Sequence, residues 1–161
     1  MSARVATSHA VGQTDFAPFA GRDHSQQLGR LGAGALLIAG AVHLALGFEH
    51  AGSNFGALAL IAGLSQGALA VALIIRPSSG LLSVVVLLQL VLIQLYLINV
   101  TLGLPPVIAH SHIGGTHQFA GLTLAWPGVV DGRGLLGKST EALAVVAALM
   151  LRRDRALRLP V

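Results

Sequence analysis

Long runs of hydrophobic residues dominate the chain. Three of them, at 31–48, 55–75 and 81–104, contain almost only apolar and small residues. Each run is long enough to cross a membrane as a helix, because the hydrocarbon core is about 30 Å thick and a helix rises about 1.5 Å per residue. A fourth run, at 135–151, is strongly apolar only over 142–151, so it crosses only if the helix starts near Leu135 with Lys138 and Glu141 at the membrane interface.

Basic residues lie mostly outside these runs and favour four crossings. Three arginines precede the first run, one lies between the second and third, and four follow the last. If both termini are cytoplasmic, eight of the ten basic residues face the cytoplasm, as the positive-inside rule requires. The sequence therefore predicts an all-α integral membrane protein, an antiparallel bundle of four transmembrane helices with N-in/C-in orientation in a bacterial plasma membrane.

The chain divides into three parts around these helices. Residues 1–27 are polar and are expected to form a mobile cytoplasmic arm, residues 28–152 the transmembrane bundle, and residues 153–161 a basic cytoplasmic tail. The outward loop 105–134 is about 30 residues long, whereas bundle connections usually have about 2 to 8. Loops of that length are typically functional or disordered. Its apolar stretch, 119–130, is expected to lie in the membrane interface.

Composition agrees with a membrane location and excludes several classes of protein. Hydrophobic residues make up 54% of the chain and charged residues only 10%, compared with about 25% charged residues in soluble domains. The absence of cysteine excludes disulfides, thiolate metal sites and thiol nucleophiles. No common nucleotide-binding, hydrolase or metalloprotease motif occurs, so an enzyme is not expected. The net charge of +4 comes from basic residues that we interpret as signals for membrane orientation. No nucleic-acid partner is therefore expected.

Small and polar residues inside the runs predict how the helices pack. In lipid, helices associate through close contacts between small residues and through polar pairs. The first run has a stripe of three small residues and one histidine, spaced four apart: Ala35, Ala39, His43 and Gly47. The second run has a similar stripe of small residues: Ala59, Gly63 and Gly67. In the third run Gln89, Tyr96 and Asn99 share one arc of the helix, whereas Gln94 lies on the other side, facing another helix or a partner protein.

Four polar residues of the packing faces form a candidate cofactor site: His43, Gln66, Gln89 and Tyr96. The simpler interpretation is that these side chains satisfy one another and fix the helix register. The alternative is a cavity for a quinone or a haem edge, because ionisable residues inside a membrane are functional candidates.

Five of the seven histidines fall in the outer half of the predicted topology. His110 and His112 point the same way if their segment is extended, and the two glycines before His117 allow the chain to turn back towards them. Imidazole binds copper and zinc well, and carboxylates can complete the ligand shell. The predicted metal ligands are His50, His110, His112 and His117, assisted by Glu49 or Glu141.

The leading hypothesis is therefore a small multi-pass membrane protein that binds copper or zinc at a histidine-rich extracytoplasmic face. It would serve metal handling, or a membrane redox complex as an accessory subunit. One alternative is a purely structural subunit of a larger membrane assembly. Another is a haem- or quinone-binding subunit that uses His43. The expected partners are the lipid bilayer and either other membrane subunits or further copies of the chain.

Overall fold

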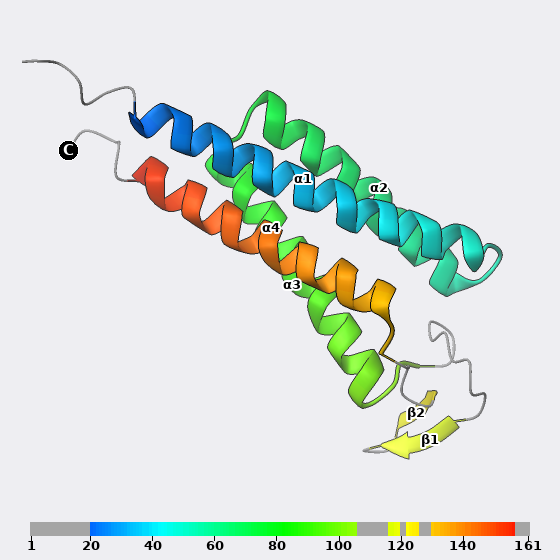
Figure 1. The fold of residues 1–161 in the computed structure, drawn as a ribbon. Helices are drawn as coiled ribbons and strands as arrows, with labels where there is room; N and C mark the ends of the chain where they lie inside the picture. Colours follow the sequence, from blue (N-terminus) through cyan, green and yellow to red (C-terminus); the bar gives the residue numbers. More distant parts are fainter. Residues whose placement is uncertain (1–19, 106–115, 120–121, 126–129, 157–161) are drawn as a thin grey trace, which may run out of the picture.

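The computed structural model describes residues 20–105, 116–119, 122–125 and 130–156. Four helices and two short strands make up this part of the chain (Figure 1). The helices are α1 (Ala20–Glu49), α2 (Asn54–Ile75), α3 (Ser79–Thr101) and α4 (Gly132–Ala156), and the strands are β1 (Thr116–Phe119) and β2 (Leu122–Ala125).

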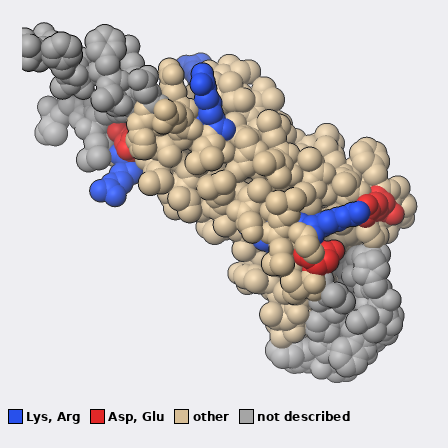
Figure 2. Space-filling view, in the orientation of Figure 1, with Lys and Arg blue, Asp and Glu red and all other residues tan. Residues whose placement is uncertain are grey.

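All four helices are long and apolar enough to cross a membrane, which confirms the predicted number of spans. Their surfaces expose many large aliphatic side chains. On the face shown in Figure 2, charged side chains gather towards the two ends of the molecule and are absent from the middle. This distribution indicates a membrane-embedded protein, because lipid solvates apolar side chains and excludes charged ones.

Two helices begin earlier than the sequence predicts. Helix α1 begins at Ala20, so the end of the segment expected to be a mobile arm is helical. Helix α4 begins at Gly132 instead of near Leu135. The Asp131 carboxylate accepts a hydrogen bond from the Gly134 N–H at 2.6 Å, so it satisfies one of the free N–H groups at the start of the helix.

Polar caps and glycine turns separate the other helices. The Ser53 hydroxyl accepts from the Gly56 N–H at 2.9 Å, and the Ser78 hydroxyl accepts from the Leu81 N–H at 3.1 Å. These contacts start α2 and α3. Gly103, just after α3, has a φ of 85°, a left-handed conformation that glycine adopts without steric cost.

Helix α1 packs against α2 and α4, and α3 packs mainly against α4. The predicted small stripe of α1 is confirmed in part, since Ala35 and Ala39 are buried. Helices α1 and α2 approach closely where Gly40 faces Gly63. A Cβ built at Gly67, predicted for the same interface, would meet nothing within 4 Å, although the Gly67 backbone nitrogen lies only 3.6 Å from a Cβ built at Gly40.

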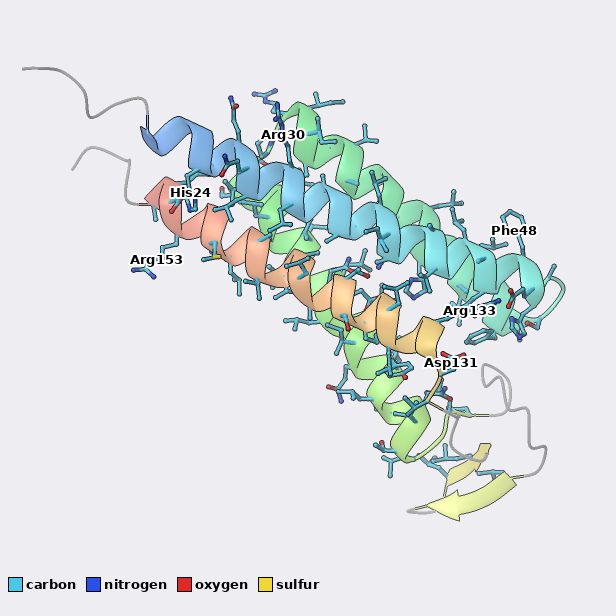
Figure 3. The ribbon with its side chains drawn as sticks, viewed as in Figure 1. His24, Arg30, Phe48, Asp131, Arg133 and Arg153 are labelled. Atoms are coloured by element: carbon cyan, nitrogen blue, oxygen red, sulfur yellow. The ribbon has the colours of Figure 1, made fainter. Side chains whose placement is uncertain are left out.

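Contacts at both ends tie α1 to α4. The Arg133 guanidinium forms an ion pair with Glu49, joining the start of α4 to the end of α1. His24 and Asp154 lie 4.0 Å apart and join the start of α1 to the end of α4. Figure 3 shows Arg133 and Asp131 at one end of the molecule and His24 and Arg153 at the other.

The two strands form an antiparallel hairpin that the sequence did not predict. The strands lie within the segment between α3 and α4, and β2 overlaps the apolar stretch expected in the interface. Each strand has four residues, too few for alternation to be distinguished from an apolar run. In Figure 1 the hairpin lies beyond the C-terminal end of α3.

Candidate functional site

Every helix contributes to one cluster of polar side chains in the middle of the molecule. We call it the polar cluster; it consists of His43 from α1, Gln66 from α2, Gln89 from α3, and Lys138 and Glu141 from α4. Gln66, Gln89 and Glu141 are completely buried. The helices thus meet around polar groups rather than around an entirely apolar core.

Glu141 is the centre of the polar cluster. Its two carboxylate oxygens accept from Lys138 Nζ at 2.9 and 2.8 Å. The Gln66 amide donates to it at 3.3 Å, and His43 Nε2 lies 3.6 Å from the same oxygen. A buried carboxylate is stable only if a cation and hydrogen bonds replace water. Lys138 is that cation, and it also donates to the Leu92 carbonyl at 3.3 Å.

His43 faces the cluster with its Nε2 atom. Its Nδ1 lies 3.0 Å from the Ala39 carbonyl oxygen, which can only accept, so Nδ1 carries a hydrogen. Nε2 therefore donates towards Glu141 only when the ring is protonated as imidazolium. Because both ring nitrogens are directed at protein oxygens, His43 in this rotamer is poorly placed as an axial haem ligand.

Three buried polar atoms lack a hydrogen-bond partner within the described part of the chain: Gln66 Oε1, Gln89 Nε2 and Tyr96 Oη. The first two belong to amides already joined by a 2.8 Å bond from Gln66 to Gln89. Tyr96 is different, since its hydroxyl bonds to neither amide; its polar neighbours are the Lys138 ammonium, 5.6 Å from the ring centroid, and the Asp131 carboxylate. Buried hydroxyls normally find a partner, so this one is free to meet a further group.

A cavity of about 220 Å³ lies beside the polar cluster. Four polar side chains from three helices line its inner part: His43, Tyr96, Asn99 and Lys138. Most of the remaining wall is apolar, including Leu46, Leu58, Ala62, Leu92 and Leu95. Exposed Asp131 and Arg133 also line it, so the cavity extends to the surface at the start of α4. An apolar cavity of about 150 Å³ holds a benzene molecule, and this one is larger.

The structure brings the predicted cofactor residues together. His43, Gln66 and Gln89 meet in the polar cluster, and Tyr96 lies beside Lys138 on the cavity wall. Sequence analysis missed the part played by Lys138, which was expected at the membrane interface. The available signal was its spacing from Glu141, because residues three apart share one face of a helix.

The predicted metal ligands are not brought together in the described residues. His110 and His112 lie outside them, and the side chain of His117 is not described although its backbone belongs to β1. The His50 ring bonds to the Leu46 carbonyl at 2.8 Å and packs edge-on against Phe55. Within the described ranges, no group of three histidines or carboxylates is arranged to hold a metal ion. The copper or zinc site stays a prediction.

The carboxylates predicted to assist a metal have other partners. Glu49 pairs with Arg133, and Glu141 pairs with Lys138. Glu141 lies more than two turns inside α4, whereas it was expected near the outer end. The earlier start of α4 at Gly132 accounts for this difference, because it moves Glu141 away from the helix end.

No family model matches the chain, and neither a curated protein nor a solved structure is similar to it.

Proposed function

We propose that this protein binds the head group of a membrane-soluble quinone in the cavity beside the polar cluster. In this proposal the four helices form an antiparallel bundle in a bacterial plasma membrane, with both termini in the cytoplasm. The ion pairs at both ends of α1 and α4 support opposite directions for these helices. The basic residues beyond α4 support a cytoplasmic C-terminus.

The chemistry of the cavity wall favours this class of ligand. A quinone is a neutral, planar ring with carbonyl oxygens that accept hydrogen bonds, and its tail dissolves in lipid. The cavity combines apolar walls with one available donor, the Tyr96 hydroxyl. Ligand sites are typically apolar with a few converging polar groups. A carbonyl oxygen of the ring would accept from the Tyr96 hydroxyl.

The observation that carries the proposal is the buried hydroxyl of Tyr96, a residue of the cavity wall, which has no hydrogen-bond partner among the described residues. A hydroxyl left unbonded in a low-dielectric site costs free energy that a ligand oxygen would recover. A purely structural role for the polar cluster does not explain why this buried hydroxyl has no hydrogen bond in the described part of the chain. A structural role explains only the hydrogen bonds from Gln66 to Gln89 and to Glu141.

We expect the purified protein to bind ubiquinone-1, a short-chain quinone, and Tyr96→Phe to weaken that binding about 5-fold. One neutral hydrogen bond contributes about 1 kcal/mol, which corresponds to that ratio. Equilibrium dialysis in detergent measures both affinities. Ser139→Ala, which removes an exposed hydroxyl of α4 away from the cavity, serves as the control and should bind as the wild type does.

A second variant tests the place of binding. Ala62→Phe puts an aromatic ring into the cavity and should abolish binding while the protein still elutes as one species in size-exclusion chromatography. Equal affinity of the wild type and Tyr96→Phe, or undiminished binding by Ala62→Phe, would reject the proposed site.

The proposed topology predicts which positions reagents reach from outside the cell. Because the chain contains no cysteine, single cysteines can be placed without background. A membrane-impermeant maleimide should label Ala51→Cys, in the turn after α1, in intact cells. It should label Ser2→Cys and Val161→Cys only after permeabilisation. Labelling of either terminal cysteine in intact cells contradicts the orientation.

A further inference from the structure

Helix α3 carries an exposed row of side chains on the side turned away from its buried residues. We call this row the α3 seam; its members are Ser83, Leu87, Leu90, Gln94, Leu97 and Thr101, and all are exposed. The exposed fractions of the three leucines are 66%, 50% and 46%. The buried residues of α3, among them Val85 and Gln89, lie on the opposite side. No described helix covers the seam.

The spacing of the α3 seam is that of a coiled coil. Its members follow one another at alternating intervals of four and three residues through the whole of α3. A row with this mean period of 3.5 residues stays on one side of a slightly supercoiled helix, so it can contact a second helix along its full length.

Gln94 is the member of the seam that lipid cannot satisfy. It lies seven residues before the end of α3, about 10 Å along the axis, and therefore within the hydrocarbon region. Its amide forms no hydrogen bond with any residue that the structure describes. The hydroxyls of the seam are bonded within their own helix, Ser83 to the Ser79 carbonyl and Thr101 to the Leu97 carbonyl.

An amide in hydrocarbon needs a partner that both donates and accepts. The same amide on a second copy of the chain meets this need, because a carboxamide is complementary to itself. Two copies inserted in the same direction place their α3 helices parallel, and a two-fold axis between them then brings Gln94 opposite Gln94. A single polar residue within an apolar seam is also the feature that fixes register in coiled coils.

We propose that the protein forms a parallel homodimer along the α3 seam, held in register by a hydrogen-bonded pair of Gln94 amides. The polar cluster and the cavity lie on the other side of α3, so dimerisation and ligand binding are separate properties. The pair at Gln94 sets which faces meet, and the leucines of the seam supply the packing area.

Cysteine cross-linking in native membranes tests the dimer directly, again without background from the chain. Leu90→Cys, Gln94→Cys and Leu97→Cys should form disulfide-linked dimers on oxidation with copper phenanthroline. Leu64→Cys on α2 and Val146→Cys on α4, whose leucine and valine are 65% and 51% exposed, are matched controls and should not. Equal cross-linking at seam and control positions, or cross-links only to a different protein, would overturn the proposal.

A second measurement isolates the amide. Gln94→Leu should weaken dimerisation roughly 3- to 30-fold, the range expected for hydrogen bonds between membrane helices, and Gln94→Asn should retain most of it. Energy transfer between labelled copies in liposomes, diluted with lipid, measures both. Unchanged dimerisation of Gln94→Leu, or a monomeric wild type, would refute the pairing. Tyr96→Phe should dimerise normally, so failure of the quinone proposal is distinguishable from failure of this one.

Discussion

Glu141→Gln is expected to destabilise the protein by about 3 to 5 kcal/mol, the usual cost of removing one partner from a buried ion pair. The substitution leaves the Lys138 ammonium, whose side chain is only 16% exposed, without a counter-ion. The amide oxygen of the substituted side chain, the Leu92 carbonyl and the face of Tyr96 would remain near it, and none of them carries a full negative charge. Unfolding in detergent micelles with increasing dodecyl sulfate, followed by circular dichroism, measures the change.

Two further variants show whether the buried charge causes this loss. Glu49→Gln breaks the exposed ion pair with Arg133 and should cost less than about 1 kcal/mol, since water solvates both ends of that pair. The double variant Lys138→Met with Glu141→Leu removes both buried charges and should recover much of the stability. A Glu141→Gln protein as stable as the wild type would show that the carboxylate is not needed as a counter-ion.

Gly63→Ala is expected to destabilise the protein by about 1 to 3 kcal/mol, the typical cost of overpacking. A Cβ at this position would lie 2.8 Å from the Gly40 carbonyl oxygen and 2.7 Å from Leu44 Cγ. The Leu44 side chain can move, but the Gly40 carbonyl belongs to the backbone of α1. The two helices must therefore separate, which weakens contacts along the whole interface. The same unfolding assay reports the loss.

Gly67→Ala is the matched control, since it makes the same change one turn further along α2. No atom outside its own stretch of helix lies within 4 Å of a Cβ built there. The variant should be as stable as the wild type or slightly more stable, because alanine has the higher helix propensity. Equal losses at both positions would mean that the close approach to Gly40 is not the cause of the loss in Gly63→Ala.

The sequence was sufficient to find the spans because a single physical quantity sets them. Hydrocarbon thickness fixes the length and composition of a crossing helix, and both are local properties. Burial of Ala35 and Ala39 was predictable for a related reason, since small residues four apart lie on one face. Local periodicity carries this information without knowledge of the partner helix.

The polar cluster was only partly predictable. His43, Gln66 and Gln89 were assigned to packing faces, but Glu141 was expected at the outer face and Lys138 at the interface. The structure pairs both residues with groups from other helices, His43, Gln66 and Leu92. Neither hydropathy nor spacing reports which distant groups compensate a charge, so charged residues near a span are assigned to its end by default.

What the sequence determined by itself is the number and approximate position of the apolar helices, because lipid acts on each segment separately. Only the tertiary structure decided which groups the charged residues of α4 contact. It also decided that Gly40 and Gly63 meet and that Tyr96 borders a cavity. These features depend on contacts between segments far apart in the chain. The free energy of such a contact depends on both of the surfaces that meet, and the sequence of one segment describes only one of them.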